Sequence, residues 1–290
     1  MVSEHRKRIL IPIVGQGSII HIIRTGMLDK LSGFCEPVIG LLWDQPDLIS
    51  ELKSKGYEVY LIPEYKVSAE YNQVKSKIDF WYRKYRVKTP SVNIQKNYID
   101  FFKKKTTYSY IKKVKDALHY ARLKIQPEYI NRLLSKEALL ITQQQSFPLY
   151  KKWINDHKIE GLFTVTPFLS EADLFARILR EADKKIIASI HSFDNVTKRG
   201  WASTFFDHYI VWNKYNKNEL ERIHPPLKEN NSITIAGAPQ FDFHFNQDFS
   251  WSKEEWLTRL NLPKDKKIIL YAGGSVVLLP NEPQYLKHLH

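Results

Sequence analysis

The sequence predicts an α/β protein built on a doubly wound parallel sheet. Residues 8–14 (RILIPIV) form an apolar run with the length of a buried strand. Residues 15–18 (GQGS) follow as a tight turn, and residues 19–31 continue as an apolar helix. Strand and helix go on alternating with short loops along the chain, which is typical of a Rossmann-like sheet.

The next elements extend this opening unit. A strand is expected at residues 36–43, a helix at 46–55 and a third strand at 57–62. Gly56 stands at the end of that helix, where a glycine commonly ends a helix. The order β-α-β-α-β therefore predicts neighbouring parallel strands.

From about residue 67 to residue 153 the pattern turns helical. Amphipathic stretches are expected at residues 76–86, 92–102, 109–124 and 128–143. We interpret this region as a helical insertion in the first domain.

Strands and helices then alternate again. Strands are expected at residues 161–165, 185–190, 209–212 and 232–236, and helices at 170–182 and 214–223. Ser170 and Asp173 have the spacing of a capping box. The first domain is expected to span residues 1–245 and a second region residues 246–290.

The sequence pattern of the second region predicts a linker helix and the start of a second Rossmann-like domain. Ser250 or Ser252 is the natural cap of a helix at residues 251–260. An apolar strand at residues 267–272 then runs into a Gly-Gly-Ser turn at 273–275. Fifteen residues follow this turn, fewer than a parallel sheet needs, so we expect this domain to be only begun.

Composition limits the class of protein. The chain has 290 residues, of which 43% are hydrophobic and 13% aromatic, and this excludes a disordered chain. No apolar run approaches the roughly 20 residues of a membrane-spanning helix. The apolar run after the charged start is too short for a secretion signal. We expect a cytoplasmic protein that is soluble or peripheral on the inner face of the cell membrane.

Cysteine and histidine usage bears on metals and cofactors. The single cysteine, Cys35, excludes an internal disulfide framework and a cysteine-based metal cluster. The ten histidines include no HExxH pattern. We therefore expect no metal site and no bound cofactor.

A strongly basic segment lies within the predicted insertion. The chain carries a net charge of +13, and residues 75–124 hold fifteen Lys or Arg against three Asp, interleaved with ten aromatic residues. This mixture suits an anionic membrane surface, where each nearby cation contributes about 1 kcal/mol. It would also suit nucleic acid. A solvated helical face with core aromatics is a further alternative. No nucleic-acid-binding motif accompanies the segment, so we favour the membrane over nucleic acid.

A family resemblance enters through four ordered blocks near the carboxyl end. Residues 189–200 (SIHSFDNVTKRG) resemble the S-x-D-N-x-T-x-[KR]-G segment of bacterial GT-B-type surface-carbohydrate glycosyltransferases. Residues 207–213 (DHYIVWN) and 234–242 (TIAGAPQFD) follow at matching distances. Residues 268–275 (IILYAGGS) come next, with PNEP at 280–283.

The resemblance implies two Rossmann-like domains that face each other across a cleft. The acceptor would bind the amino-terminal domain and the nucleotide donor mostly the carboxyl-terminal one. The group is similar to CDP-glycerol glycerophosphotransferases and UDP-GlcNAc 2-epimerases. The residues that usually hold the donor would lie beyond His290. Two alternatives follow: the chain is active by itself, or it is inactive alone and works with a separately encoded carboxyl-terminal half.

Candidate catalytic residues follow the strand expected at residues 185–190. His191 and Asp194 are the candidates for the base that deprotonates an acceptor hydroxyl, because ligands gather at the carboxyl ends of parallel strands. His191 has a suitable intrinsic pKa, and Asp194 would orient it or act itself. In the alternative interpretation Asp194 and Asn195 only cap the turn.

Further residues are expected around the same cleft. Lys198 and Arg199 would bind a diphosphate or an anionic acceptor, unless they are simply solvated. Glycine amides at 273–275 would face the donor phosphate. The full substrate-binding set is Gly15, Gly17, Ser18, Ser192, Asn195, Lys198, Arg199 and Gln240, with Gly273, Gly274 and Ser275 for the donor phosphate.

The expected function is a metal-independent transfer of a sugar or glycerophosphate. The donor would be a nucleotide sugar or CDP-glycerol, used as a substrate, and the acceptor an envelope polysaccharide or a lipid-linked glycan. One alternative is a sugar-nucleotide epimerase, which shares the fold but needs no basic membrane-facing segment. The other is a non-catalytic acceptor-binding partner subunit.

Overall fold

A computed structural model describes most of the chain. The described residues are 6–88, 114, 117–118, 121–122, 125–199, 202–224, 226–230, 232–245, 250–274, 282 and 284. The chain divides into two compact units, residues 1–242 and residues 243–290. We describe each unit by itself.

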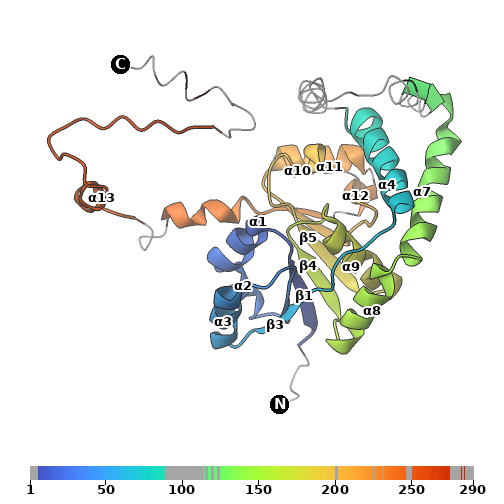
Figure 1. Ribbon diagram of the computed structural model, residues 1–290, viewed down its shortest axis with the longest axis horizontal. Coiled ribbons are helices and arrows are strands. Elements are labelled where there is room, and N and C mark those ends of the chain that lie inside the picture. Colours follow the sequence, from blue (N-terminus) through green and yellow to red (C-terminus); the bar gives the residue numbers. More distant parts are fainter. Residues whose placement is uncertain are drawn as a thin grey trace. The chain divides into compact units, whose positions relative to one another are not determined.

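The first unit is organised around a seven-stranded parallel sheet (Figure 1). The strand order is β3-β2-β1-β4-β5-β6-β7, and every neighbouring pair is parallel. The strands are β1 (Arg8–Ile13), β2 (Glu36–Leu41), β3 (Glu58–Leu61), β4 (Gly161–Thr164), β5 (Lys185–Ser189), β6 (His208–Val211) and β7 (Ile233–Ile235). The α/β class and the Rossmann-like sheet predicted from the sequence are confirmed.

The order of the strands creates a switch point beside β1. The chain first builds outward through β2 and β3, and then returns so that β4 pairs with the opposite side of β1. Loops that leave β1 and β4 therefore separate in opposite directions at the carboxyl edge. Ligands of open α/β sheets bind in the crevice that such a reversal leaves.

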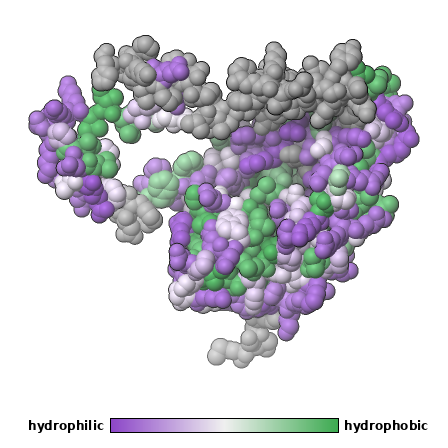
Figure 2. Space-filling model, viewed as in Figure 1, coloured by the Kyte–Doolittle hydropathy of each residue, from purple (hydrophilic) through white to green (hydrophobic). Residues whose placement is uncertain are grey.

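Helices cover both faces of the sheet because alternate side chains of a strand point to opposite faces. Leu10 of β1 belongs to a core shared with α8 (Ser146–Asp156) and α9 (Ser170–Glu181). Ile11 of β1 belongs to a second core shared with α3 (Pro46–Ser54). On the face shown in Figure 2, hydrophilic side chains of the first unit alternate with apolar patches.

The expected helix at residues 19–31 is two separate elements. A short first turn, α1 (Gln16–Ser18), leads into the π-helical segment η1 (Ile19–Arg24), and α2 (Met27–Leu31) follows. The break falls at Gly26, whose φ of +73° is open to glycine but costly for other residues. Gly56, with a φ of +85°, ends α3 as expected.

The insertion is helical where the structure describes it. It contains α4 (Ala69–Trp81), the π-helical η2 (Tyr82–Val87) and α7 (Pro127–Thr142), and α8 follows. Val74 and Ile78 of α4 pack with Ile130 and Leu133 of α7. The expected helix at 92–102, most of that at 109–124 and the corresponding part of the basic segment lie outside the described residues.

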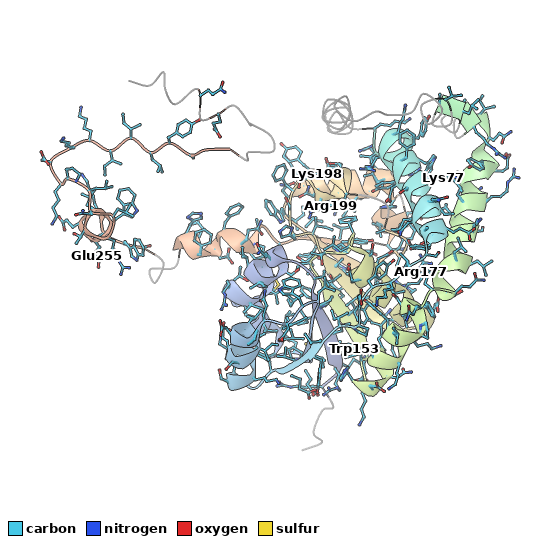
Figure 3. The ribbon with its side chains drawn as sticks, in the orientation of Figure 1. Lys77, Trp153, Arg177, Lys198, Arg199 and Glu255 are labelled. Carbon is cyan, nitrogen blue, oxygen red and sulfur yellow. The ribbon has the colours of Figure 1, made fainter. Side chains whose placement is uncertain are left out.

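A buried polar network ties this insertion to the rest of the unit. Glu137 of α7 is 3% exposed, and both of its carboxylate oxygens accept hydrogen bonds from Arg177 of α9. The Tyr71 hydroxyl of α4 donates to the same carboxylate at 2.8 Å. Figure 3 shows Arg177 between the sheet's helices and the insertion. The network therefore joins three helices that are distant in sequence.

The predicted capping box at Ser170 and Asp173 is wrong. Residue 169 is the N-cap of α9, with no side-chain cap, and Asp173 is almost fully buried. Its carboxylate instead accepts hydrogen bonds from the backbone N–H groups of Ser203 and Thr204. Burial raises the pKa of Asp173, while Lys75 and Arg177 act in the opposite direction. The carboxylate is thus used for long-range contacts rather than for capping.

The remaining helices of the first unit continue the alternation along the chain. They are α10 (Asn195–Lys198), α11 (Lys214–Ile223), α12 (Pro226–Glu229) and the 3-10 helix η3 (Pro239–Phe245), which runs up to the second unit. The bounds of α11 are those expected from the sequence. Asn213 caps it by accepting hydrogen bonds from the N–H groups of residues 215 and 216.

The described part of the second unit contains the end of η3, the helix α13 (Lys253–Arg259) and an extended segment. Ser252 and Glu255 form a reciprocal capping box, so the expected serine cap is confirmed. The strand expected at residues 267–272 is not formed in the described residues, and the corresponding apolar side chains are exposed. A strand requires a hydrogen-bonding neighbour, and none of the described residues supplies one.

No helix in the part of the chain that the structure describes combines the length and apolar character needed to cross a membrane.

Candidate functional site

The candidate site lies where the loops after β1 and β5 meet at the carboxyl edge of the sheet. Gly17 follows β1, and His191 follows β5. A Cβ atom placed on Gly17 would lie 2.6 Å from Nε2 of His191, closer than real Cβ atoms come to other atoms. The imidazole therefore packs directly on the Gly17 backbone. This glycine is required by close approach rather than by a left-handed conformation.

Two amides hold the His191 segment in place. The Asn195 side-chain amide lies 3.2 Å from Nδ1 of His191. The Nε2 amide of Gln240, on η3, donates to the His191 carbonyl at 3.2 Å. The atom beside Nδ1 is the amide nitrogen Nδ2, which donates, so in this arrangement Nδ1 accepts and the ring proton lies on Nε2. For Nε2 to act as a base, the Asn195 amide must turn its oxygen toward a protonated Nδ1. Asn195 is thus placed to select the tautomer.

The electrostatic surroundings keep the imidazole neutral. Partial burial lowers the pKa of His191, and Arg199 lowers it further, while Asp194 acts in the opposite direction. The ring is half-buried rather than sealed. A neutral imidazole at physiological pH has a lone pair that can accept a proton.

Asp194 lies in the same loop but makes different contacts. Its carboxylate accepts a hydrogen bond from the Ser192 hydroxyl at 2.8 Å and pairs with Lys198 at 3.0 Å. Burial raises the pKa of Asp194, but the hydrogen bonds from Ser192 and Lys198 outweigh it, and the net pKa is lowered. Asp194 is therefore ionised and organises the turn that begins α10. The side chain within hydrogen-bonding distance of the imidazole is that of Asn195.

A second histidine lies beneath the first. His21, on η1, is fully buried, and its ring centroid lies 5.9 Å from that of His191. Burial and then His191 lower the pKa of His21 to about 4, while Gln240 and Asp242 act in the other direction. His21 is therefore neutral across the physiological range. Two neutral imidazoles, one from η1 and one from the loop after β5, therefore lie next to each other.

This interior holds unsatisfied polar atoms. Neither ring nitrogen of His21 has a hydrogen-bond partner among the described residues, and the same holds for Oγ of Ser18 and Oε1 of Gln240. Ser18 and His21 are three residues apart on one helical face. Buried polar groups are normally paired, so such a cluster marks a place where ordered water or a ligand atom belongs.

Sequence analysis did not identify His21 as a functional candidate. The available signal was a single histidine in the apolar run Ile19-Ile20-His21-Ile22-Ile23, directly after the glycine turn. Such a residue is easily taken for a core histidine. Its relation to His191 depends on a contact between residues that are 170 positions apart, and this appears only in the folded chain.

Aromatic side chains surround the outer end of the loop. Phe193 is 62% exposed, and its ring lies 6.0 Å from that of Trp212, which contacts Phe241 in turn. The Asn216 amide fixes this loop by donating to the Phe193 carbonyl at 2.7 Å. An exposed aromatic ring next to His191 offers a flat apolar surface to a ligand.

Cationic side chains flank the same loop. Figure 3 shows Lys198 and Arg199 on and after α10. The Lys198 ammonium pairs with Asp194, and both Lys198 and Arg199 are largely exposed. Their positive charge beside a half-buried imidazole favours an anionic ligand.

The predicted site residues thus fall into separate groups. Gly17, Asn195 and Gln240 come together with His191, and Ser18 is fully buried beside His21. The described contacts do not give Gly15 a side-chain neighbour. The catalytic and substrate-binding roles of all these residues remain predictions.

The glycines expected to bind a donor phosphate belong to the second unit. The Gly274 N–H donates to a carboxylate oxygen of Glu282 at 2.6 Å, and the same carboxylate lies near Gly273. Ser275 lies outside the described residues. An amide that already holds a carboxylate is able to bind an anion.

No group of three or more His, Cys, Asp or Glu side chains in the described part of the chain is arranged to hold a metal ion.

Comparison with known proteins places the site within a matched region. Residues 181–273 match the model of a family described as CDP-glycerol:poly(glycerophosphate) glycerophosphotransferase. This region is about a third of the chain, and it contains His191, Asn195 and Gln240. The match supports the expected resemblance to glycosyltransferase-type enzymes.

Among solved structures, a glycosyltransferase from Rickettsia africae ESF-5 is similar to 90% of this chain, with 9% sequence identity and a TM-score of 0.43. The alignment covers 51% of that protein's chain, so this chain spans about half its length. No curated protein matches the sequence.

Proposed function

We propose that this chain is the acceptor-side part of a transferase that moves a glycosyl or glycerophosphoryl group from a nucleotide-activated donor to a hydroxyl acceptor. The observation that carries the proposal is the neutral, half-buried His191, packed on Gly17 at the carboxyl edge of the sheet. It lies within the region that matches glycerophosphotransferases.

In the proposed reaction, Nε2 of His191 accepts the proton of the acceptor hydroxyl. The oxygen then attacks the transferred group, a new bond to that group forms, and the bond to the nucleotide breaks. The leaving nucleotide carries away the bonding electron pair. This step needs the ring proton on Nδ1, so we propose that the Asn195 amide turns its oxygen toward Nδ1 in the reacting complex and thereby keeps the lone pair of Nε2 available.

Charge and shape assign the neighbouring residues. Arg199 and Lys198 would attract the phosphate groups of a donor or of an anionic acceptor. Phe193 would present its exposed ring to the apolar face of a sugar. We further propose an envelope polysaccharide or a lipid-linked glycan as the acceptor, reached from the cytoplasmic face of the membrane.

The test uses the full chain with CDP-glycerol or a panel of nucleotide sugars and a polyol or glycan acceptor. Release of the nucleotide is measured for the wild type, for His191→Gln and for His208→Gln. His208 is a suitable control because it begins β6, at the opposite edge of the sheet. We expect His191→Gln to lose roughly 10²- to 10⁴-fold in rate, and His208→Gln to stay within about twofold, a margin far below that loss.

A different outcome would reject the role of His191. If His191→Gln released nucleotide as fast as the wild type, the base would have to lie elsewhere. If the wild type neither released nucleotide nor gained thermal stability with any donor, the chain would be assigned to acceptor binding alone. A ligand at 100 times its Kd would otherwise stabilise the protein by about 2.7 kcal/mol.

A further inference from the structure

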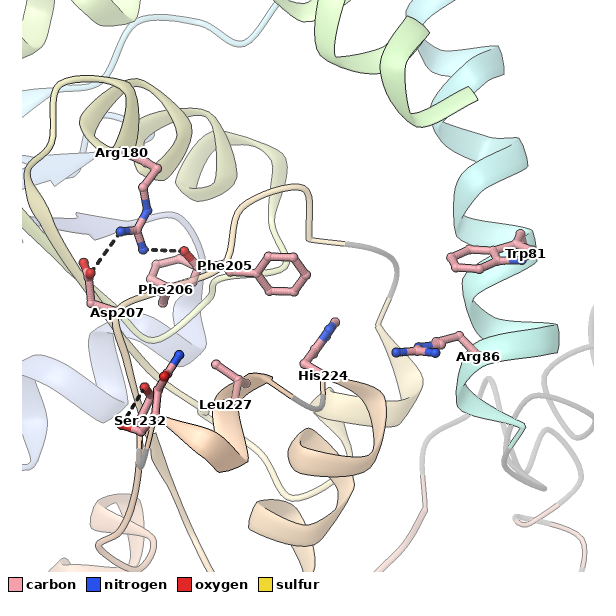
Figure 4. Close-up of a pocket in the computed structure, with 10 residues that line it drawn as sticks. Trp81, Arg86, Arg180, Phe205, Phe206, Asp207, His224, Leu227 and Ser232 are labelled. Atoms are coloured by element: carbon pink, nitrogen blue, oxygen red, sulfur yellow. Dashed lines mark hydrogen bonds and ion pairs between the residues drawn. The ribbon is translucent and has the colours of Figure 1, made fainter. Parts of the chain in front are cut away.

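A pocket of about 590 Å³ opens at the amino edge of the sheet, away from His191 (Figure 4). Asp207 and Ser232, which line it, directly precede β6 and β7. His191 follows the opposite, carboxyl end of β5. The volume is within the range of roughly 300 to 1,000 Å³ that is usual for small-molecule sites.

Two walls of different origin form the pocket. Trp81 and Arg86 come from α4 and η2 of the helical insertion, while Phe205 and His224 come from the sheet side. In Figure 4 these two pairs project toward each other across the opening. Leu227 adds an apolar surface below them. The pocket is therefore lined by aromatic and aliphatic groups, together with two arginines and one aspartate.

The charges of the lining residues do not cancel. Arg180 pairs with Asp207 at 2.9 Å and also donates to the Phe205 carbonyl. Arg86 donates from Nε to the Ile223 carbonyl at 2.9 Å, and the described residues give it no acidic partner. Burial and Arg86 lower the pKa of His224 to about 4, so His224 is neutral near pH 7. One positive charge, that of Arg86, is left in the pocket.

The hydrogen bond of Arg86 leaves its terminal nitrogens for a ligand. Its Nε caps the carboxyl end of α11, which fixes the plane of the guanidinium. A fixed guanidinium binds a carboxylate or phosphodiester through two parallel N–H groups. We propose that this pocket binds an amphipathic monoanion, with its carboxylate or phosphodiester on Arg86 and its apolar body between Trp81 and Phe205.

The experiment is calorimetric titration of the full chain with dihexanoylphosphatidylglycerol, at concentrations where it stays monomeric. This probe combines a phosphodiester with two short apolar chains. Glycerol 3-phosphate supplies a soluble phosphomonoester without apolar chains, and dihexanoylphosphatidylcholine supplies the apolar chains on a zwitterion. We expect the first probe to bind at least tenfold more tightly than either of the other two.

Three variants locate the binding. Arg86→Gln removes the charge, and Asn230→Asp adds a negative charge to the lining while leaving the contact between Arg86 and Ile223 intact. Arg83→Gln removes the same charge from η2 at a residue that does not line the pocket. We expect at least a tenfold loss of affinity in the first two variants and less than a twofold change in the third.

The proposal is overturned by any of three results. The first is unchanged affinity in a folded Arg86→Gln protein. The second is equally tight binding of glycerol 3-phosphate, which would indicate a soluble phosphate as the ligand. The third is an equal loss in Arg83→Gln, which would indicate diffuse attraction to the basic surface.

Discussion

Gly17 and Gly15 differ in what surrounds them, although they belong to one short turn. The space beside Gly17 is occupied by the His191 ring, whereas nothing lies within 4 Å of a Cβ atom built on Gly15. A glycine-rich turn after a first strand is commonly associated with phosphate binding. Here the contact with the imidazole gives one of the two glycines a different role, which is to let His191 approach the backbone.

This difference predicts unequal effects of two alanine substitutions. Gly17→Ala would place a methyl group against Nε2 of His191, and we expect a loss of about 1 to 3 kcal/mol in the free energy of unfolding, as for other overpacked sites. Gly15→Ala is the matched control and should change it by less than about 0.5 kcal/mol. Urea unfolding of both variants measures this. Equal stability of the two would mean that His191 moves away freely.

Among the contacts between helices, we expect the buried carboxylate of Glu137 to contribute more to the free energy of unfolding than a surface ion pair does. It accepts hydrogen bonds from Arg177 and Tyr71, so it joins α7 to both α9 and α4. The Lys136–Glu70 pair also joins α7 to α4, but both of its side chains are more than half exposed. Burial therefore distinguishes two ion pairs that sequence alone would treat alike.

We expect Glu137→Gln to destabilise the protein by about 3 to 5 kcal/mol, because it removes the carboxylate that is hydrogen-bonded to the buried Arg177. Glu70→Gln should cost less than about 1 kcal/mol. Chemical denaturation of both variants tests this. Adding Arg177→Met to Glu137→Gln should recover part of the loss. If the two single variants were equally stable, the buried network would not hold the insertion.

How far the sequence predicts each element depends on where its hydrogen-bonding partners lie. The strands of the first unit are apolar runs with neighbours inside the unit, and they were predicted close to their observed positions. The run at 267–272 has the same composition but finds no neighbouring strand among the described residues. Asp173 was assigned to a cap because spacing cannot reveal a contact with residues 203 and 204.

The candidate site shows the same limit at the scale of the whole molecule. The motif containing His191 is local, so it could be found in the sequence. The contribution of Gly17, His21 and Gln240 depends on contacts between the first and the last parts of the unit. The residues that line the pocket at the amino edge range from 81 to 232 in the sequence, so no local sequence pattern predicts this pocket.

Acid sensitivity of the whole fold follows from its buried groups, and its sign can be worked out. The pKa of His21 is lowered to about 4 by burial, against an ordinary value of 6.5. Between pH 6.5 and 4, His21 therefore binds a proton in the unfolded chain but stays neutral in the folded chain. The contribution of His21 to the free energy of unfolding is fully present above pH 6.5 and is lost as the pH falls toward 4. The shift corresponds to about 3 kcal/mol.

Glu58 extends the loss to lower pH. Hydrogen bonds from Arg8 and Tyr60 lower its pKa to about 2, so its contribution is present above its ordinary value of 4.5 and is lost as the pH falls toward 2. His224, with a pKa lowered to about 4, acts in the same range as His21. The free energy of unfolding should thus decline in two stages, the first due to histidines and the second to a carboxylate.

Urea unfolding at pH 7.5, 5.5 and 4.5 isolates the first of these stages. We expect the wild type to lose stability between pH 7.5 and 4.5, and His21→Leu to lose about 2.5 kcal/mol less over that interval, because leucine takes up no proton. Glu58→Gln should keep the decline over this interval, since its own titration lies mainly below it. A His21→Leu protein that declined as steeply as the wild type would show that other groups control the acid response, and that His21 is protonated without cost in the folded chain.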